Sequence, residues 1–151
     1  MDELDRRLLQ LLQEDGRAPF TQLAKKVGLS ETAVRSRYKN LVEQGVVRTV
    51  SIVDPYALDF QAPALINIAV EPGQLEAVAR QVGDLPETAY LVVTLGPYDL
   101  LAEVYCRNLK QLTELVTQRI QSIPGVRSTA TSMVAQVYKL SYRWSPSPEE
   151  T

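Results

Sequence analysis

Apolar residues in the first 45 positions recur at helical spacing in three stretches. Leu4, Leu8, Leu11 and Leu12 fall at i, i+4, i+7 and i+8, with Leu9 on the flank of this stripe, which predicts a helix that ends before Gly16. A short second helix is expected at about 21–27. A third should follow Ser30, a preferred N-cap residue, and run to about Gln44, with Gly45 as its C-terminal stop. Two helices joined by a tight glycine-containing turn are typical of a helix-turn-helix.

The pattern changes from helical to extended after Gly45. Residues 46–53 are β-branched and partly alternating, which predicts one or two short strands that would form a wing. We therefore expect a winged helix-turn-helix domain at 1–53, followed by a linker at 54–62.

The second half of the chain reads β-α-β-β-α-β. Strands are expected at about 64–70, 89–95, 100–106 and 127–142, and helices around 75–82 and 109–122. This order is that of a ferredoxin-like fold, an antiparallel sheet with both helices on one face. The sequence thus predicts an α+β protein with a ferredoxin-like domain at 63–144. A disordered tail is expected at 145–151.

The last predicted strand suggests how the free face of this sheet is covered. It presents Thr129, Thr131 and Met133 on one side and alternates with uncharged small or apolar residues on the other. Neither side suits an uncovered aqueous face. We therefore expect sheet-to-sheet self-association as dimers.

Composition excludes several kinds of chemistry. The chain has 151 residues, no histidine and a single cysteine, Cys106, in an apolar run. Without histidine there can be no Ser-His-Asp triad, Cys-His pair or Cys/His zinc site. We expect no enzymatic activity, no metal and no cofactor, with Cys106 as a small buried hydrophobe. The acidic N-terminus lacks a signal-peptide pattern and no apolar run is long enough to span a bilayer, so the cytoplasm is the expected location, without membrane contact.

Charge is distributed unevenly along the chain. The formal net charge is −2, yet residues 20–48 hold six cations against two anions, a balance of +4. Residues 49–151 hold seven cations against eleven anions, a balance of −4. A basic module on an acidic body suits a protein that contacts nucleic-acid phosphate at one end only.

The third predicted helix is the candidate recognition helix. With Val34 facing inward, Tyr38 and Leu41 share its buried side, and the opposite side would face a DNA major groove. We expect double-stranded DNA as the partner of this surface, through the following residues: Lys25, Lys26, Ser30, Glu31, Thr32, Arg35, Ser36, Arg37 and Lys39.

These residues are expected to differ in role. Arg35 can donate two hydrogen bonds to guanine, and Thr32 and Ser36 can reach base edges or phosphate, whereas the lysines would contact phosphate. Arg37 could equally bind phosphate or brace the helix through a carboxylate. Glu31 is unusual on such a face, unless it accepts a hydrogen bond from a cytosine amine or caps the helix.

Two features of the second domain could bind a small molecule. Gly96-Pro97-Tyr98-Asp99 is either an ordinary hairpin turn or a loop that offers backbone amides, an aromatic wall and a carboxylate for an amino group. Thr129 and Thr131 share a strand face, where their hydroxyl groups are either ordinary strand composition or could hold a polar ligand group at an oligomer interface. The candidate effector-binding residues are Gly96, Tyr98, Asp99, Thr129 and Thr131.

Motifs along most of the chain match one family in order and spacing. They are Leu4–Arg17, Leu23-Ala24, Val27–Ser30, Val34–Arg37, Leu41–Val47, Gly96–Asp99, Ile123–Val126, Thr129 and Thr131. On these motifs the chain resembles the leucine-responsive regulator/asparagine-synthase regulator (feast/famine) family. Two residues depart from the family pattern: Pro97, which stiffens the loop, and Tyr38, where an aliphatic residue is usual.

The resemblance implies a winged helix-turn-helix followed by a regulatory domain that assembles as dimers and often as rings of dimers. It also implies operators with two-fold symmetry and amino-acid effectors bound between dimers, near residues 96–99, Thr129 and Thr131. The expected function is a sequence-specific transcription regulator. An architectural DNA-compacting protein and a metabolite-binding module without DNA binding remain the alternatives.

Overall fold

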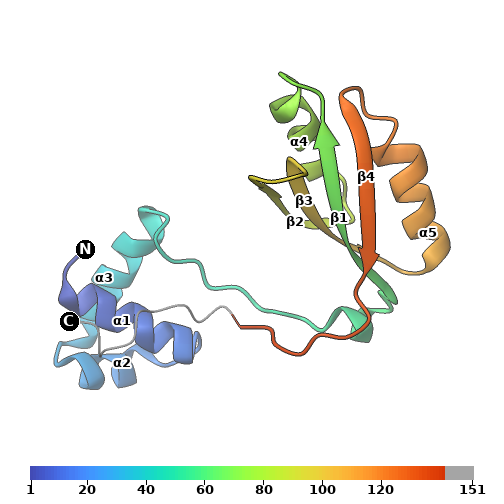
Figure 1. The fold of residues 1–151 in the computed structure, drawn as a ribbon. Helices are drawn as coiled ribbons and strands as arrows, with labels where there is room; N and C mark the ends of the chain where they lie inside the picture. The colour runs from blue at the N-terminus through green and yellow to red at the C-terminus, as the bar shows by residue number, and fades with distance from the viewer. Residues whose placement is uncertain (142–151) are drawn as a thin grey trace. The chain divides into compact units, whose positions relative to one another are not determined.

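The computed structural model describes residues 1–141, which form two compact units: Met1–Ile52 together with residues 139–141, and Val53–Tyr138 (Figure 1). The expected disordered tail at 145–151 lies outside the described residues, as does the predicted end of the last strand at Tyr142. No helix in the described part of the chain is both long and apolar enough to cross a membrane.

The first unit contains the three predicted helices: α1 (Glu3–Glu14), α2 (Phe20–Val27) and α3 (Glu31–Glu43). Asp2 and Asp5 exchange hydrogen bonds in a capping box that starts α1. Ser30 caps α3 as predicted, because its Oγ accepts from the amide of Ala33 at 3.2 Å. The glycines that follow α2 and α3 are both in the left-handed region, with φ of +71° at Gly28 and +69° at Gly45.

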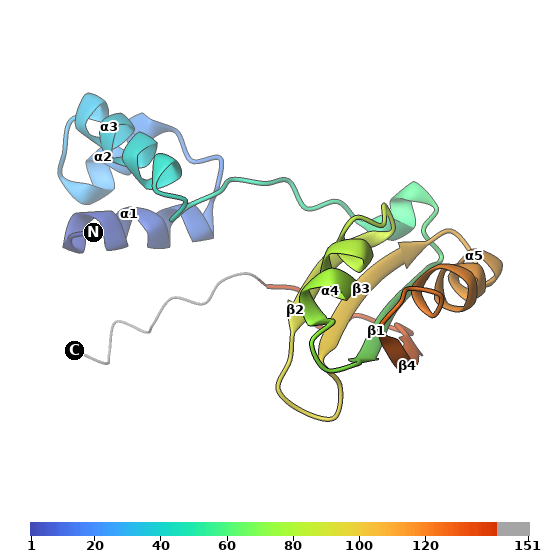
Figure 2. The same ribbon diagram turned by 90° about the horizontal axis from the view of Figure 1, so that it is seen from above.

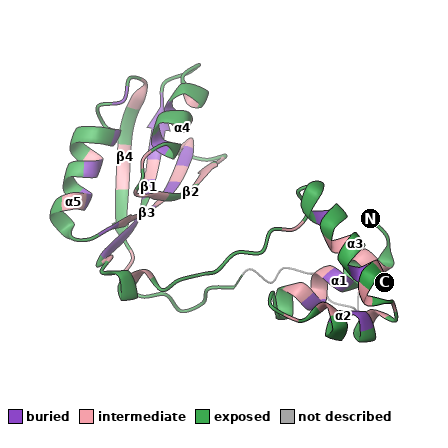
Figure 3. Ribbon diagram, turned by 180° about the vertical axis from the view of Figure 1, so that it is seen from behind, coloured by how far each residue is buried: buried purple, intermediate pink, exposed green. Residues whose placement is uncertain are grey.

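A small apolar core holds these helices together. Its buried members are Leu8, Leu11, Leu23, Ala24, Val34 and Leu41, contributed by all three helices. In Figure 3 the three helices carry buried stretches among residues that are half-buried or exposed. The core fixes which face of α3 points outward.

The prediction of a strand at 46–53 is wrong. The backbone after Gly45 forms no strand up to residue 53, and Val50, Ile52 and Val53 are more than half exposed. The β-branched composition was read correctly as non-helical, but a strand needs a neighbouring strand to satisfy its N–H and C=O groups. No such neighbour lies beside this segment among residues 1–141, so the predicted wing is not formed in the single chain.

The second unit has the predicted βαββαβ order. After a 3₁₀ turn at Pro55–Leu58, its elements are β1 (Ala62–Val70), α4 (Leu75–Gly83), β2 (Thr88–Val93), β3 (Leu100–Cys106), α5 (Leu109–Glu114) and β4 (Val126–Met133). The strands form one antiparallel sheet in the order β2-β3-β1-β4, and both helices lie on the same face of it (Figure 2).

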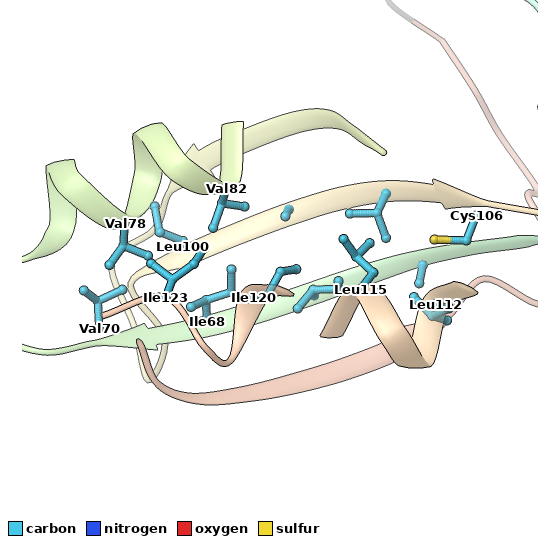
Figure 4. Close-up of a cluster of buried hydrophobic side chains, with 14 of the residues drawn as sticks. Ile68, Val70, Val78, Val82, Leu100, Cys106, Leu112, Leu115, Ile120 and Ile123 are labelled. Atoms are coloured by element: carbon cyan, nitrogen blue, oxygen red, sulfur yellow. The ribbon is translucent and has the colours of Figure 1, made fainter. Parts of the chain in front are cut away.

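The space between the sheet and the helices is filled with apolar side chains (Figure 4). Ile66, Ile68 and Leu100 from the sheet are fully buried with Val78 and Val82 from α4. Cys106 is fully buried in the same core, as predicted. Burial raises the pKa of its thiol, and the nearby Glu87 carboxylate raises it further, so the neutral thiol is favoured.

Two elements of this unit differ from the prediction. The second helix is α-helical only as far as Glu114, and Leu115–Ile120 continues it as a π-helix. The last strand ends at Met133 rather than near 142, because β1 beside it begins at Ala62 and offers no partner beyond that point. The following residues up to 141 form no strand and are mostly exposed.

Candidate DNA-binding and effector sites

Helix α3 presents a continuous polar face to solvent. Val34 and Leu41 point into the core, while Thr32, Arg35, Ser36 and Lys39 are exposed, as the helical spacing predicts. Lys25 and Lys26 are exposed in the last turn of α2, and Ser30 is exposed at the start of α3. The expected DNA-contacting side chains therefore lie on two consecutive helices of one unit.

Arg35 is held in a defined position on this face. Its Nε and Nη2 both donate to Oε1 of Glu31, at 2.9 and 2.6 Å, one helical turn earlier. Its guanidinium carbon lies 4.6 Å from the centroid of the Phe20 ring. Glu31 does not cap α3, because Ser30 does. Its carboxylate instead accepts the two hydrogen bonds from Arg35.

Arg37 braces α3 against α1. Its Nη1 donates to Oδ2 of Asp2 and to Oδ1 of Asp5, each at 2.7 Å. Of the two roles left open by the sequence, bracing through a carboxylate is the one for which the structure supplies contacts. A phosphate contact would have to use the other edge of the same guanidinium.

The brace shifts the titration of its groups. The Asp5 amide, which donates to the Asp2 carboxylate, lowers the pKa of Asp2, and the Arg37 guanidinium lowers it further. The hydrogen bonds to Asp5 and Asp2 raise the pKa of Arg37. Both shifts favour the ionised pair, so the contact between α1 and α3 persists at neutral pH.

Tyr38 links α3 to the segment that follows it. Its ring meets that of Phe20 edge to face, with centroids 5.4 Å apart, and its hydroxyl lies 3.0 Å from Oγ1 of Thr49. Tyr38, which stands where an aliphatic residue is usual, therefore adds an aromatic contact to Phe20, the ring over which Arg35 lies. It also ties the extended residues after Gly45 to the helices.

In the second unit, the loop at 94–99 joins β2 to β3. Oγ1 of Thr94 donates to the carbonyl of Tyr98 at 2.7 Å, and the amide of Val70 donates to Oδ2 of Asp99 at 2.7 Å. Asp99 therefore secures the end of β1, a role that the sequence did not reveal. Gly96 at the tip is exposed, and Tyr98 is half-buried.

The structure brings the two parts of the predicted effector region to the same level of the sheet. Ile68 of β1 pairs with Leu100 on one side and with Thr129 on the other, and the amide of Asp99 donates to the Ile68 carbonyl at 3.0 Å. Two strand spacings, roughly 10 Å, thus separate the backbones of Asp99 and Thr129. Oγ1 of Thr129 accepts from Gln121 at 2.8 Å, and Thr131 is exposed.

These residues do not line either of two hollows in the described chain. One, of about 430 Å³, lies beside Arg37 and Asn40, and the other, of about 310 Å³, lies beside Phe60 and Tyr105. Gly96 and Thr131 are exposed, so this part of the predicted effector region is open to solvent in one chain. Among residues 1–141 there is also no cluster of metal-ligating side chains.

Comparison with known proteins identifies both units. The AsnC-type helix-turn-helix domain matches residues 1–42, and the Lrp/AsnC ligand binding domain matches residues 63–144. The chain belongs to the Lrp/AsnC family. It is thus a DNA-binding transcription regulator with a ligand-binding domain, as the resemblance of its motifs predicted.

Relatives of this Lrp/AsnC regulator match it over nearly its whole length. The HTH-type transcriptional regulator FL11 of Pyrococcus abyssi is 36% identical over 140 residues, 92% of each chain. The structure of AsnC from E. coli superposes with a TM-score of 0.84 at 26% identity, covering 97% of this chain and 99% of that one. A transcriptional regulator from Neisseria meningitidis in complex with L-Met superposes with a TM-score of 0.83 at 25% identity, covering 94% of each chain.

Several contacts of the site residues were not predicted from the sequence, although two of these contacts have a recognisable spacing in it. The aspartates at positions 2 and 5 have the i, i+3 spacing of a capping box, and Glu31 and Arg35 have the i, i+4 spacing of a helical ion pair. By contrast, Arg37 with Asp5 and Asp99 with Val70 are 32 and 29 residues apart. No local pattern indicates such pairs.

Proposed function

We propose that this Lrp/AsnC regulator reads its operator with α3 and that Arg35 makes the main base contact. The supporting observation is the exposed polar face of α3, on which Arg35 is held by Glu31 over the Phe20 ring. Thr32 and Ser36 lie beside it on the same face. Lys25, Lys26 and Lys39 contact phosphate and set the register of the helix in the groove.

The protein acts as a dimer in this proposal. The strands turn one face to the helices, and the opposite face carries Leu65, 36% exposed, and Tyr90, 56% exposed, on either side of Glu103. A second copy that covers this face would remove the apolar surface from water. Two recognition helices would then enter successive major grooves of an operator with two-fold symmetry, roughly 34–36 Å apart.

An amino acid is the proposed effector. The ligand-binding domain and the L-Met complex of the Neisseria meningitidis protein support this class of ligand. Gly96 and Thr131, in the region that also holds Tyr98, Asp99 and Thr129, are exposed in one chain, so a bound effector would be enclosed by a further dimer. The effector would then change operator affinity by changing assembly.

The same proposal holds that the protein works by binding rather than by catalysis, in the cytoplasm. The absence of histidine from the sequence and the low nucleophilicity of a buried Cys106 thiol support the first part. The identity of the family as transcription regulators supports both.

Selection from a random duplex library at one moderate salt concentration tests the proposal, with and without a mixture of the twenty amino acids. Enrichment of a site with two-fold symmetry is expected, together with a change in affinity caused by one amino acid. Binding without enrichment that disappears as salt rises would instead indicate an architectural protein. No binding at all would indicate a module that senses a metabolite without DNA.

The Arg35→Ala variant tests the assigned contact in the same experiment. Loss of roughly 1–3 kcal/mol and relaxed preference at one base position are expected, because a bidentate arginine distinguishes guanine from other bases. An equal loss for all sequences would make Arg35 a phosphate contact.

A further inference from the structure

Glu31 is an acidic side chain on the face that meets DNA. It is the first residue of α3, and its side chain is 37% exposed. A carboxylate there repels phosphate and, without another function, weakens binding to every sequence. The proposed base contacts do not account for it.

The contacts of Glu31 occupy one edge of the Arg35 guanidinium. Nε and Nη2 both donate to the same carboxylate oxygen, which engages the side edge of the planar group. Three of the five N–H groups of an arginine then remain, and they lie on Nη1 and Nη2. That end edge has the two parallel donors that match O6 and N7 of guanine.

Phe20 restricts the same guanidinium in a second direction. The guanidinium carbon lies over the Phe20 ring, 4.6 Å from its centroid. Phe20 itself is supported by Tyr38, whose hydroxyl contacts Thr49. The hydrogen-bonded edge and the contact with the ring together restrict the direction of the group.

The other i, i+4 ion pairs among residues 1–141 lack these features, including Arg80 and Glu76, which share a single hydrogen bond of 3.1 Å. Lys39 and Glu43, also one turn apart on α3, approach only to 3.7 Å, and both side chains are more than half exposed. Lys110 and Glu114 approach to 3.9 Å. Exposed pairs of this kind contribute little, so the double contact and the ring distinguish Glu31 and Arg35.

We propose that Glu31 is a positioning residue for base readout, which orients the Arg35 guanidinium so that its Nη1/Nη2 edge faces the base. The inference rests on the proposed function, because it assumes that Arg35 contacts a base. Glu31 then has two opposite effects on DNA binding. The carboxylate lowers affinity for DNA in general, and it raises the preference for the correct base at the position that Arg35 reads.

Two substitutions separate charge from hydrogen bonding. Glu31→Gln removes the charge but leaves a side-chain oxygen that accepts from Nε and Nη2. Glu31→Ala removes both. Glu43→Ala is the matched control, because it removes a carboxylate from the same helix without touching Arg35. Thermal unfolding of each full-length variant checks that α3 remains folded.

The experiment measures affinity for the selected operator, for its single-base variants and for random duplex at one salt concentration. Glu31→Ala and Glu31→Gln should raise the affinity for random duplex by a similar factor. Only Glu31→Ala should lower the base preference at the Arg35 position, by at least about fivefold. In the Arg35→Ala background, Glu31→Ala should change that preference no further, because the two effects are not additive.

Three results would overturn the inference while leaving the regulator intact. They are an unchanged base profile in Glu31→Ala, a change at a base position other than that of Arg35, and additive effects of the two substitutions. The second result would indicate that Glu31 itself accepts from a cytosine amine. Failure of the unaltered protein to enrich any sequence would instead overturn the proposed function, and this inference with it.

Discussion

The carboxylate of Asp99 accepts a hydrogen bond of 2.7 Å from the backbone amide of Val70, 29 residues earlier in the chain. The bond joins the start of β3 to the end of β1, beside the loop that is proposed to meet an effector. Asp99 therefore has a structural function in addition to any contact with a ligand. Substitutions at this position must separate the two.

Asp99→Asn is expected to abolish the amino-acid response without unfolding the domain. An asparagine oxygen can still accept from the Val70 amide, but the negative charge that would attract an ammonium group is lost. Asp99→Ala should also lower the free energy of unfolding by about 1–3 kcal/mol, because the Val70 amide loses its partner. DNA binding titrated with the effector, together with chemical denaturation, measures both. A normal response in the stable Asn variant would move the effector site elsewhere.

Gly125→Ala should destabilise the ligand-binding domain by at least about 2 kcal/mol. Gly125 has a φ of +96°, and a Cβ there would lie only 2.7 Å from Cβ of Gln74. Gly83→Ala is the matched control, since an added Cβ at that helical position would meet Leu91 at an ordinary 3.6 Å. Urea denaturation of both variants gives the comparison. Equal stability of the two variants would contradict the steric argument.

The brace between α1 and α3 should weaken in acid. Because the pKa of Asp2 is lowered in the folded protein by the Asp5 amide and by Arg37, its stabilisation is complete above the unfolded pKa. It is lost as the pH falls through the lower, folded pKa, below about pH 4. Asp2→Asn keeps the cap but removes the charge, so its melting temperature should depend less steeply on pH in this range.

Glu3→Gln is the matched control for this measurement. Glu3 lies in the same helical turn but forms no salt bridge within the described chain. Circular dichroism melts between about pH 5 and pH 2 cover the range in which aspartate titrates. A slope for Asp2→Asn as steep as that of the unaltered protein would show that the Asp2–Arg37 pair adds nothing to stability.

The sequence predicted those parts of the fold that depend on local patterns. The helices of the first unit and β3 were placed within about two residues, because apolar periodicity, the Ser30 cap and the left-handed glycines act over one or two turns. The strand expected at 46–53 failed because strand formation depends on a partner that composition does not reveal. The early end of β4 at Met133 has the same cause.

The same distinction applies to the candidate sites. Helical spacing alone placed Arg35 and Lys39 on the exposed face of α3. It could not show that Arg37 forms salt bridges with Asp2 and Asp5, because that contact depends on how the helices pack. The role of Glu31 stayed open for a different reason. Its spacing to Arg35 was available, but the ring of Phe20, from another helix, completes the arrangement.

Self-association through the free face of the sheet gives the last prediction. Leu65 is at the middle of β1 and faces away from the helices, opposite Glu103 on one side and Ser132 on the other. Leu65→Glu would place a second carboxylate beside Glu103 inside the proposed dimer interface, where two like charges without a partner are strongly unfavourable. The dimer dissociation constant should rise at least about tenfold, the effect of 1.4 kcal/mol. Leu109→Glu, which changes the same residue type at a 61% exposed position at the start of α5, should leave it unchanged. Sedimentation equilibrium measures both constants, and melting curves verify that each variant is folded. If the two variants associate equally well, the dimer must use a surface other than this face of the sheet, and the operator geometry derived from it would have to be replaced.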